Sequence, residues 1–320
     1  MPWKERSVVR EPARGAADRR EGVVVRAAAK VNLFLRVTGA RPDGFHDIET
    51  LIVPLSLADR IGIRAGRSET DEHLSLGVEG DPGLTSEVPT GEENLILRAA
   101  RALRDATGVR GFAEFSLSKA IPTGAGLGGG SADAAAALRA LNLAWGCGLD
   151  ESRLSELAAG VGSDVPALMA GGPIVARGRG ERVEAVRIPG LSWALATLPF
   201  GVSTADAYRW WDEDGAGSGP DPAGLVAALS RLADEGAPDE TLRDLVYNDL
   251  EAPVVRRRPL IAEVKDLLLS AGSLAVVMCG SGSSVAAILP GDRPELDATH
   301  REEIERLCGR TIIHAVSEAS

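Results

Sequence analysis

The chain has few cysteines and no long apolar run. Its 320 residues include three cysteines, Cys147, Cys279 and Cys308, and no two of them form a Cys-x-x-Cys pair. Neither a disulfide framework nor a zinc site is therefore predicted, and the cysteine usage fits the reducing cytoplasm. No uninterrupted apolar stretch reaches the roughly 18 residues that a membrane span needs, so no span is predicted.

An excess of positive charge is also missing, because the formal net charge is −11. General binding to nucleic acid or to an anionic membrane surface requires basic patches, so the charge balance argues against both kinds of partner. A small anionic ligand stays compatible with the sequence, since its site needs only local positive charge. The first twenty residues carry six Lys or Arg against three acidic residues, and no apolar segment follows them. We predict a flexible N-terminal tail over residues 1–22 and no signal peptide.

Alternation of apolar residues and turn signals predict a mixture of strands and helices. Residues 23–37 form a β-branched, apolar strand, and further strands of a meander are predicted over 48–57, 59–65 and 74–79. An amphipathic helix is predicted over 94–107, where Gly108 stops it.

A glycine-rich loop separates the strand predicted over 112–119 from a helix predicted over 132–141. Five of the seven residues from Gly124 to Gly130 are glycine. Glycines allow close approach and positive φ, and a helix start offers unpaired N–H donors with partial positive charge. Ser131 is the expected N-cap of the helix, with Asp133 in its first turn. Together these features predict an anion site.

A dinucleotide site, a Walker A loop and a simple turn all fit this loop less well. The loop matches the pattern G-x-G-x-x-G of dinucleotide-binding folds. Such a fold needs a buried parallel strand before the loop and a second strand after the helix. Here the preceding strand alternates polar and apolar residues and no strand is predicted after the helix, so a dinucleotide-binding fold is disfavoured. A Walker A loop is excluded because no Gly-Lys-Ser/Thr occurs. A tight turn without a ligand would need only one or two glycines, and each further glycine costs backbone entropy.

Three further segments contain candidate functional residues. Lys30 and Asn32 share one face of the first strand, which is either the wet face of an edge strand or a site where a lysine reaches a phosphate or a reacting oxygen. Asp164 lies before Pro166 and is either a helix N-cap or a fixed carboxylate close to the glycine loop. Phe45 and His46, taken alone, are ordinary packing and surface residues.

The motifs together resemble one kinase family. The glycine loop from Pro122 to Ser131 resembles the phosphate-binding motif of the galactokinase, homoserine kinase, mevalonate kinase and phosphomevalonate kinase (GHMP) superfamily. The segments 29–35, 41–46, 93–96, 162–166, 248–251 and 280–284 are similar, in order, to those of the 4-diphosphocytidyl-2-C-methyl-D-erythritol kinase family. The resemblance covers about residues 23 to 289.

This resemblance implies an α+β fold of two lobes, 23–188 for ATP and 189–320 for the substrate, with the active site in the cleft between them. It implies transfer of the γ-phosphoryl group of ATP to the 2-hydroxyl of 4-diphosphocytidyl-2-C-methyl-D-erythritol, in non-mevalonate isoprenoid synthesis. Asp164 would be the general base and Lys30 its partner. Mg²⁺ is expected with ATP, and Ser131 is the expected protein ligand. The expected ATP contacts are Asn94, Leu95, Lys119, Pro122, Thr123, Gly124, Ala125, Gly126, Leu127, Gly128, Gly129, Gly130, Ser131 and Ala132.

The substrate's cytidyl end is expected to meet Asn32, Phe45, His46 and Tyr208. Phe45 departs from the family, which commonly has tyrosine there; a phenyl ring can still stack on cytosine but loses the phenolic hydrogen bond. Asp133 stands where the family often has asparagine. Its carboxylate would repel the triphosphate unless Mg²⁺ or Lys119 compensates the negative charge. Alternatively, it caps the helix.

Two other functions fit the sequence less well. A kinase of another small alcohol, such as homoserine or mevalonate, is disfavoured by the segments around Lys30 and Phe45. A non-catalytic sensor is disfavoured because it would not need both Lys30 and Asp164. We expect a cytoplasmic monomer or weak homodimer.

Overall fold

The computed structural model describes residues 8–9, 22–215, 219–235 and 242–317, which fall into two compact units. The first unit comprises Met1–Ala29, Leu57–Thr123 and Gly128–Gly171, and the second comprises Lys30–Ser56, Gly124–Leu127 and Gly172–Ser320. Strands β2 (Val23–Ala40) and β3 (His46–Arg67) contribute residues to both units. The units are therefore not contiguous in sequence, unlike the lobes 23–188 and 189–320, which stay a prediction.

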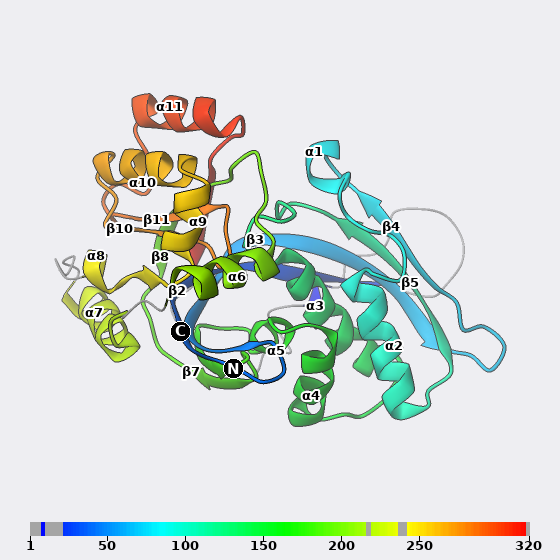
Figure 1. The fold of residues 1–320 in the computed structure, drawn as a ribbon. Coiled ribbons are helices and arrows are strands. Elements are labelled where there is room, and N and C mark those ends of the chain that lie inside the picture. The colour runs from blue at the N-terminus through cyan, green and yellow to red at the C-terminus, as the bar shows by residue number, and fades with distance from the viewer. Residues whose placement is uncertain (1–7, 10–21, 216–218, 236–241, 318–320) are drawn as a thin grey trace. The chain divides into compact units, whose positions relative to one another are not determined.

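The first unit packs helices on one side of a sheet (Figure 1). Strand β5 pairs antiparallel with β3 and parallel with β4, so the predicted meander is wrong at β4. Its apolar core joins the strands to α2, α3, α4 and α5, with Trp145 and Phe115 among the buried rings. The elements that lie wholly in this unit are β1 (Val8–Val9), β4 (Leu74–Glu79), α1 (Pro82–Thr85), α2 (Leu95–Thr107), β5 (Gly111–Ser118), α3 (Gly129–Ala144), α4 (Glu151–Val161) and α5 (Val165–Met169).

Several predicted elements of this unit are confirmed and others are corrected. Helix α2 begins after Asn94 and ends at Gly108, which adopts a left-handed conformation with φ 67°. The two strands predicted over 48–57 and 59–65 are one strand, β3, because Asp59 is bonded to backbone N–H groups inside the protein and does not break the strand. Within the predicted tail, Val8–Val9 pairs antiparallel with β2; the tail's other residues, apart from residue 22, lie outside the described part of the chain.

The second unit contains a four-stranded antiparallel sheet of order β10-β11-β8-β12, and α9 and α10 lie beside it in Figure 1. Its core joins this sheet to α6, α9, α10 and α11. Strand β6 pairs with β3 and β7, while the short β9 pairs parallel with β2. The elements are β6 (Ile174–Gly178), β7 (Arg182–Ala185), β8 (Leu191–Ala196), α6 (Thr204–Asp214), α7 (Pro222–Glu235), α8 (Leu242–Leu245), β9 (Tyr247–Asn248), α9 (Glu251–Arg257), α10 (Leu260–Ser270), β10 (Ala275–Met278), β11 (Val285–Leu289), α11 (Ala298–Cys308) and β12 (Ile313–Ser317).

The predicted α+β class is confirmed by this mixture of helices and sheets. In the described part of the chain, no helix has both the length and the apolar character needed to cross a membrane.

Candidate active site

The glycine loop adopts a backbone that side chains other than glycine disfavour. Gly124, Gly126 and Gly128 have φ values of 68°, 77° and 73°, in the left-handed region. Helix α3 begins directly after Gly128, three residues earlier than predicted, and Gly128 occupies its N-cap position. The expected N-cap role of Ser131 is therefore wrong. Within the described residues no side chain caps α3, so N–H groups of its first turn remain available to an anion.

The part of the loop in the second unit packs tightly on the turn at 279–284. A Cβ added to Gly126 would lie 2.0 Å from the Cys279 carbonyl oxygen, which only glycine tolerates. The Ser284 N–H donates to the Ala125 carbonyl at 3.2 Å. The loop is thus fixed by backbone contacts with another glycine-rich turn, far away in sequence.

Lys30 and Asn32 are both buried, each with 4% of its surface exposed. The Lys30 Nζ donates to Asn32 Oδ1 at 2.7 Å and to the Gly126 carbonyl at 3.0 Å, and its backbone N–H donates to the Leu127 carbonyl at 3.0 Å. Asn32 Nδ2 in turn donates to Thr50 Oγ1 at 2.9 Å. The interpretation of this strand face as a wet edge is wrong, because a buried ammonium is bonded to the glycine loop itself.

Asp164 belongs to the first unit and occupies the N-cap position of α5. Its side chain makes no capping hydrogen bond to α5, so capping does not explain this carboxylate. The turn before it lies near the glycine loop through Leu95, whose Cδ1 lies 3.7 Å from a Cβ added at Gly130 and 3.9 Å from one added at Gly162. The structure thus places Leu95 beside Gly130 and beside the turn that carries Asp164, while the ATP contact of Leu95 and the role of Asp164 stay predictions.

Asn94 is held by the helix that it precedes. Its Oδ1 accepts the Ile96 N–H at 2.9 Å, and its Nδ2 donates to the Pro89 carbonyl at 2.7 Å. Both ends of the amide are therefore used within the protein, and the expected ATP contact of Asn94 stays a prediction. Thr123, another expected ATP contact, donates from Oγ1 to the Leu84 carbonyl at 3.2 Å.

Lys119 lies in a buried cluster that the sequence did not predict. Its ammonium pairs with Asp59 and lies 3.4 Å from Asp133 Oδ2. Asp59 Oδ1 also accepts the N–H groups of Ala120 and Ile121, at 2.6 and 2.9 Å. The cluster supports the first turn of α3 from inside, because Nζ would lie 3.2 Å from a Cβ added at Gly129.

Asp133 therefore neither caps α3 nor extends into solvent. Only 3% of its surface is exposed, and its Oδ1 has no hydrogen-bond partner among the described residues. Burial raises the pKa of Asp133 to about 8; the negative charge of Asp59 acts in the same direction and Lys119 opposes it. Of the predicted roles for this carboxylate, compensation by Lys119 is the one that the contacts support, and helix capping is wrong.

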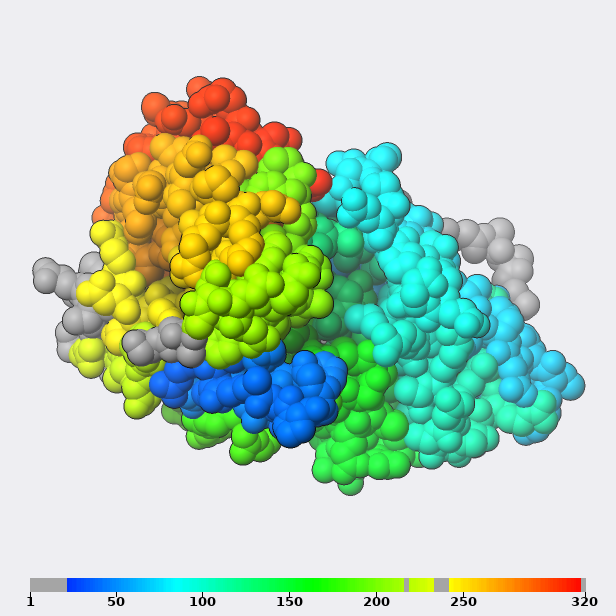
Figure 2. Space-filling view, in the orientation of Figure 1, coloured from blue at the N-terminus to red at the C-terminus, as the bar shows by residue number. Residues whose placement is uncertain are grey.

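A ring cluster in the second unit brings together the predicted substrate residues His46 and Tyr208. Their rings stack with centroids 4.8 Å apart, and Trp211 meets His46 edge-on at 5.6 Å. Asp212 Oδ1 lies 2.8 Å from His46 Nε2. Figure 2 shows the blue surface of the loop before His46 alongside the yellow-green surface of α6, which carries the other three residues.

Phe45 is 45% exposed, and the Arg179 guanidinium lies 3.6 Å from its ring centroid. A cation over one ring face leaves an exposed aromatic surface next to His46. Sequence reasoning missed Asp212 and Trp211, although their spacing from Tyr208, four and three residues along a helix, places all three on one helix face.

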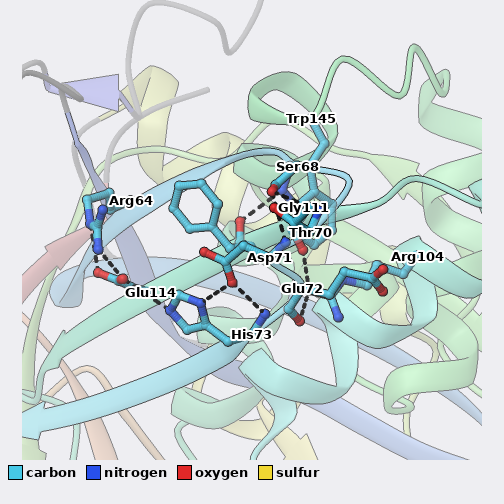
Figure 3. Close-up of polar contacts among 11 residues, drawn as sticks. Arg64, Ser68, Thr70, Asp71, Glu72, His73, Arg104, Gly111, Glu114 and Trp145 are labelled. Carbon is cyan, nitrogen blue, oxygen red and sulfur yellow. Dashed lines mark hydrogen bonds and ion pairs between the residues drawn. The ribbon is translucent and has the colours of Figure 1, made fainter.

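A second polar cluster joins β3, β5 and the segment before β4 in the first unit (Figure 3). His73 contacts Asp71 through Nδ1 at 2.6 Å and Glu114 through Nε2 at 3.1 Å, and Arg64 pairs with Glu114. The hydrogen bond with Asp71, followed by the charges of Asp71 and Glu114, raises the pKa of His73. The cluster contains none of the predicted site residues.

The uncapped start of α3 in the first unit and the buried Lys30 in the second are groups of the kind that bind phosphate, and similarity to known proteins gives the class of the protein. Residues 94–172 match the GHMP kinases N terminal domain, and residues 226–305 match the GHMP kinases C terminal domain. The fold is also that of a homoserine kinase from Cytophaga hutchinsonii, with a TM-score of 0.65 at 18% identity, covering 96% of this chain and 98% of that one.

Within this class, the sequence is 45% identical over 260 residues to a 4-diphosphocytidyl-2-C-methyl-D-erythritol kinase of Pelotomaculum thermopropionicum, covering 81% of this chain and 86% of the relative. A relative of the same name from Symbiobacterium thermophilum is 41% identical, with 82% and 89% covered. A crystal structure of a 4-(cytidine 5'-diphospho)-2C-methyl-D-erythritol kinase superposes with a TM-score of 0.73 at 32% identity, covering 93% of this chain and all of that one. The chain belongs to the 4-diphosphocytidyl-2-C-methyl-D-erythritol kinase family.

Proposed function

We propose that this protein transfers the γ-phosphoryl group of ATP to the 2-hydroxyl of 4-diphosphocytidyl-2-C-methyl-D-erythritol, a step of isoprenoid precursor synthesis. The observation that carries the proposal is the buried Lys30 ammonium, which is bonded to the carbonyl of Gly126 in the glycine loop. Membership of the family supports the choice of acceptor, since relatives of that name match most of the chain. The alternatives, a homoserine or mevalonate type of kinase and a sensor, are not favoured by these relatives.

Asp164 is the proposed general base. Its carboxylate takes the proton of the acceptor hydroxyl while the hydroxyl oxygen attacks the γ-phosphorus and the bond to the β-phosphate oxygen breaks, releasing ADP. Lys30 is proposed to stabilise the charge that develops on the transferring group. Support for Asp164 comes from the turn that carries it, which shares the neighbour Leu95 with Gly130, and from its position before α5, which it does not cap.

The N–H groups of the loop and of the first turn of α3 are proposed to hold the phosphates of ATP. Mg²⁺, which Ser131 would help to hold, would neutralise phosphate charge. Protein sites for Mg²⁺ beside phosphates often supply only one or two oxygens. The partly buried Ser131 hydroxyl in this turn fits that requirement, and among the described residues no group of three or more His, Cys, Asp or Glu could hold a metal without phosphate.

The cytidyl end is proposed to meet Asn32, Phe45, His46 and Tyr208. The stacked rings of His46 and Tyr208 and the exposed ring of Phe45 offer aromatic surface to a base. A monomer or weak homodimer in the cytoplasm stays our prediction.

The experiment is an ADP-release assay with a panel of alcohols: the cytidyl substrate, homoserine and mevalonate. We expect turnover with the cytidyl substrate alone; turnover of another alcohol in its place would overturn the proposal. Asp164→Asn should lower kcat on the order of 10²–10⁴-fold and leave ATP affinity nearly unchanged. A kcat close to that of the unmodified enzyme would refute the role of Asp164 as base.

A further inference from the structure

The segment 247–251 contains a sequence motif to which the proposed chemistry gives no role. It is attached to strand β2, which carries Lys30 and Asn32. Within it, the backbone of β9 pairs with β2 at Phe34 and Leu35, and the Asp249 N–H donates to the Leu35 carbonyl at 2.9 Å. The segment is therefore fixed to the strand that supplies the proposed catalytic lysine.

Asn248 links this segment to the turn at 279–284. Its side chain is buried, and its Nδ2 donates to the Met278 carbonyl at 2.8 Å and to the Gly280 carbonyl at 2.7 Å. Its Oδ1 accepts the Leu250 N–H at 3.0 Å. One amide therefore uses one N–H donor at the end of β10 and the other within the turn, which fixes where the backbone of Gly280 lies.

Gly280 is in turn close to the Lys30 ammonium. It has φ 54°, and an added Cβ would lie 3.0 Å from Lys30 Nζ, 3.2 Å from the Gly126 carbonyl oxygen and 3.3 Å from Asn32 Oδ1. These last two atoms both accept a hydrogen bond from the Lys30 ammonium. A shift of this turn would open the space beside Nζ and let the ammonium leave its acceptors.

We infer that Asn248 is a positioning residue for Lys30: its amide holds the turn at Gly280 against the ammonium and keeps that charge on the glycine loop. The catalytic consequence rests on the proposed function of Lys30, whereas the positioning itself does not. All of the contacts that carry the inference lie within the second unit.

The test is amine labelling by reductive methylation, with the modification of each lysine quantified by mass spectrometry. In the unmodified protein Lys30 and Lys119 should both be protected, because both side chains are buried. In Asn248→Ala, loss of the hydrogen bonds to the Met278 and Gly280 carbonyls should speed labelling of Lys30 on the order of tenfold and leave Lys119 protected.

Asp249→Asn is the matched control. Asp249 is equally buried and also holds the segment to β2, through the Val37 N–H at 2.7 Å, but it does not bond the turn. It should leave the protection of Lys30 unchanged. Protection of Lys30 in a folded Asn248→Ala protein, or equal exposure in both variants, overturns the inference.

Should Asn248→Ala expose both lysines, it has unfolded, and Asn248→Ser, which keeps one donor, gives the same comparison in a milder form. The kinase assay then separates the two proposals. A shift of the ammonium by about 1 Å should lower kcat on the order of 10²-fold. Faster labelling of Lys30 with unchanged kcat would support its positioning by Asn248 and refute its catalytic role.

Discussion

Replacing Gly126 by alanine tests whether the glycine loop is fixed by its contact with the turn at 279–284. The added Cβ would lie 2.0 Å from the Cys279 carbonyl oxygen, where ordinary contact begins at 3.4 Å, so one of the two backbones must move by about 1.4 Å. The φ of 77° adds strain of about 1–2 kcal/mol for a residue with a side chain. The overpacking adds roughly 1–3 kcal/mol.

Gly124→Ala is the matched control, because it carries the same backbone strain without the clash. Gly124 has φ 68°, and the nearest neighbour of an added Cβ is Gly201 Cα at 3.9 Å. In urea unfolding we expect the free energy of unfolding to fall by about 1–2 kcal/mol in Gly124→Ala and by about 2–5 kcal/mol in Gly126→Ala. Because the Gly126 carbonyl accepts the Lys30 ammonium, Gly126→Ala should also lower kcat on the order of 10²-fold more than the control.

Agreement between the two variants would refute this reasoning. Equal free energies of unfolding, within about 0.5 kcal/mol, would mean that the turn yields to the added methyl group without cost. Equal values of kcat would mean that the position of the Gly126 carbonyl does not determine the position of the Lys30 ammonium.

Three single-residue changes test other parts of the molecule. Phe45→Ala should raise the KM for the cytidyl substrate and spare that for ATP, in steady-state kinetics; equal effects on both would make the ring structural. Burial raises the pKa of Asp133 to about 8, so the folded protein favours the protonated carboxyl, and the stability that this protonation contributes is lost as pH rises from about 4 through 8. Asp133→Asn should therefore reduce the fall in melting temperature between pH 5 and 8. An unchanged dependence of melting temperature on pH would contradict the raised pKa. The pKa of His73, measured by NMR, should exceed 6.5 and should fall in Asp71→Asn. Because this pKa is raised in the folded protein, the stability that protonated His73 contributes is present below pH 6.5 and lost as pH rises through the raised pKa. An unchanged pKa in Asp71→Asn would show that Asp71 does not raise it.

The sequence predicted the parts of the site that depend on local pattern. A run of glycines between a strand and a helix predicts an anion site, and polar Lys30 and Asn32 on an apolar strand allow either a wet edge or a functional site; the structure excludes the wet edge, and anion binding stays a prediction. The start of α3 was predicted wrongly because Ser131 is a favourable N-cap by residue type, whereas the left-handed backbone of Gly128 lets the helix begin earlier.

Local sequence patterns do not predict which distant segments of the chain contact one another. Asp59 binds Lys119 across 60 residues, and the amide of Asn248 reaches Gly280 across 32. Nothing in the residue type at either position indicates which residue it binds, because the topology of the sheets determines the partner. The position of Asp59 among apolar residues in the middle of the long strand β3 was a signal that could have indicated a buried partner for it.

The glycines of the loop meet different physical requirements, so richness in glycine alone does not measure phosphate binding. Gly126 must lack a side chain because the Cys279 carbonyl occupies that space. Gly129 must also lack one, because Ile121 and the Lys119 ammonium would lie 3.1–3.3 Å from an added Cβ. At Gly124 only the sign of φ requires glycine. Since Gly126 and Gly129 are each closed by the protein on one side, the backbone at each is held within its own unit, and a preorganised backbone of this kind avoids the cost of ordering it on binding.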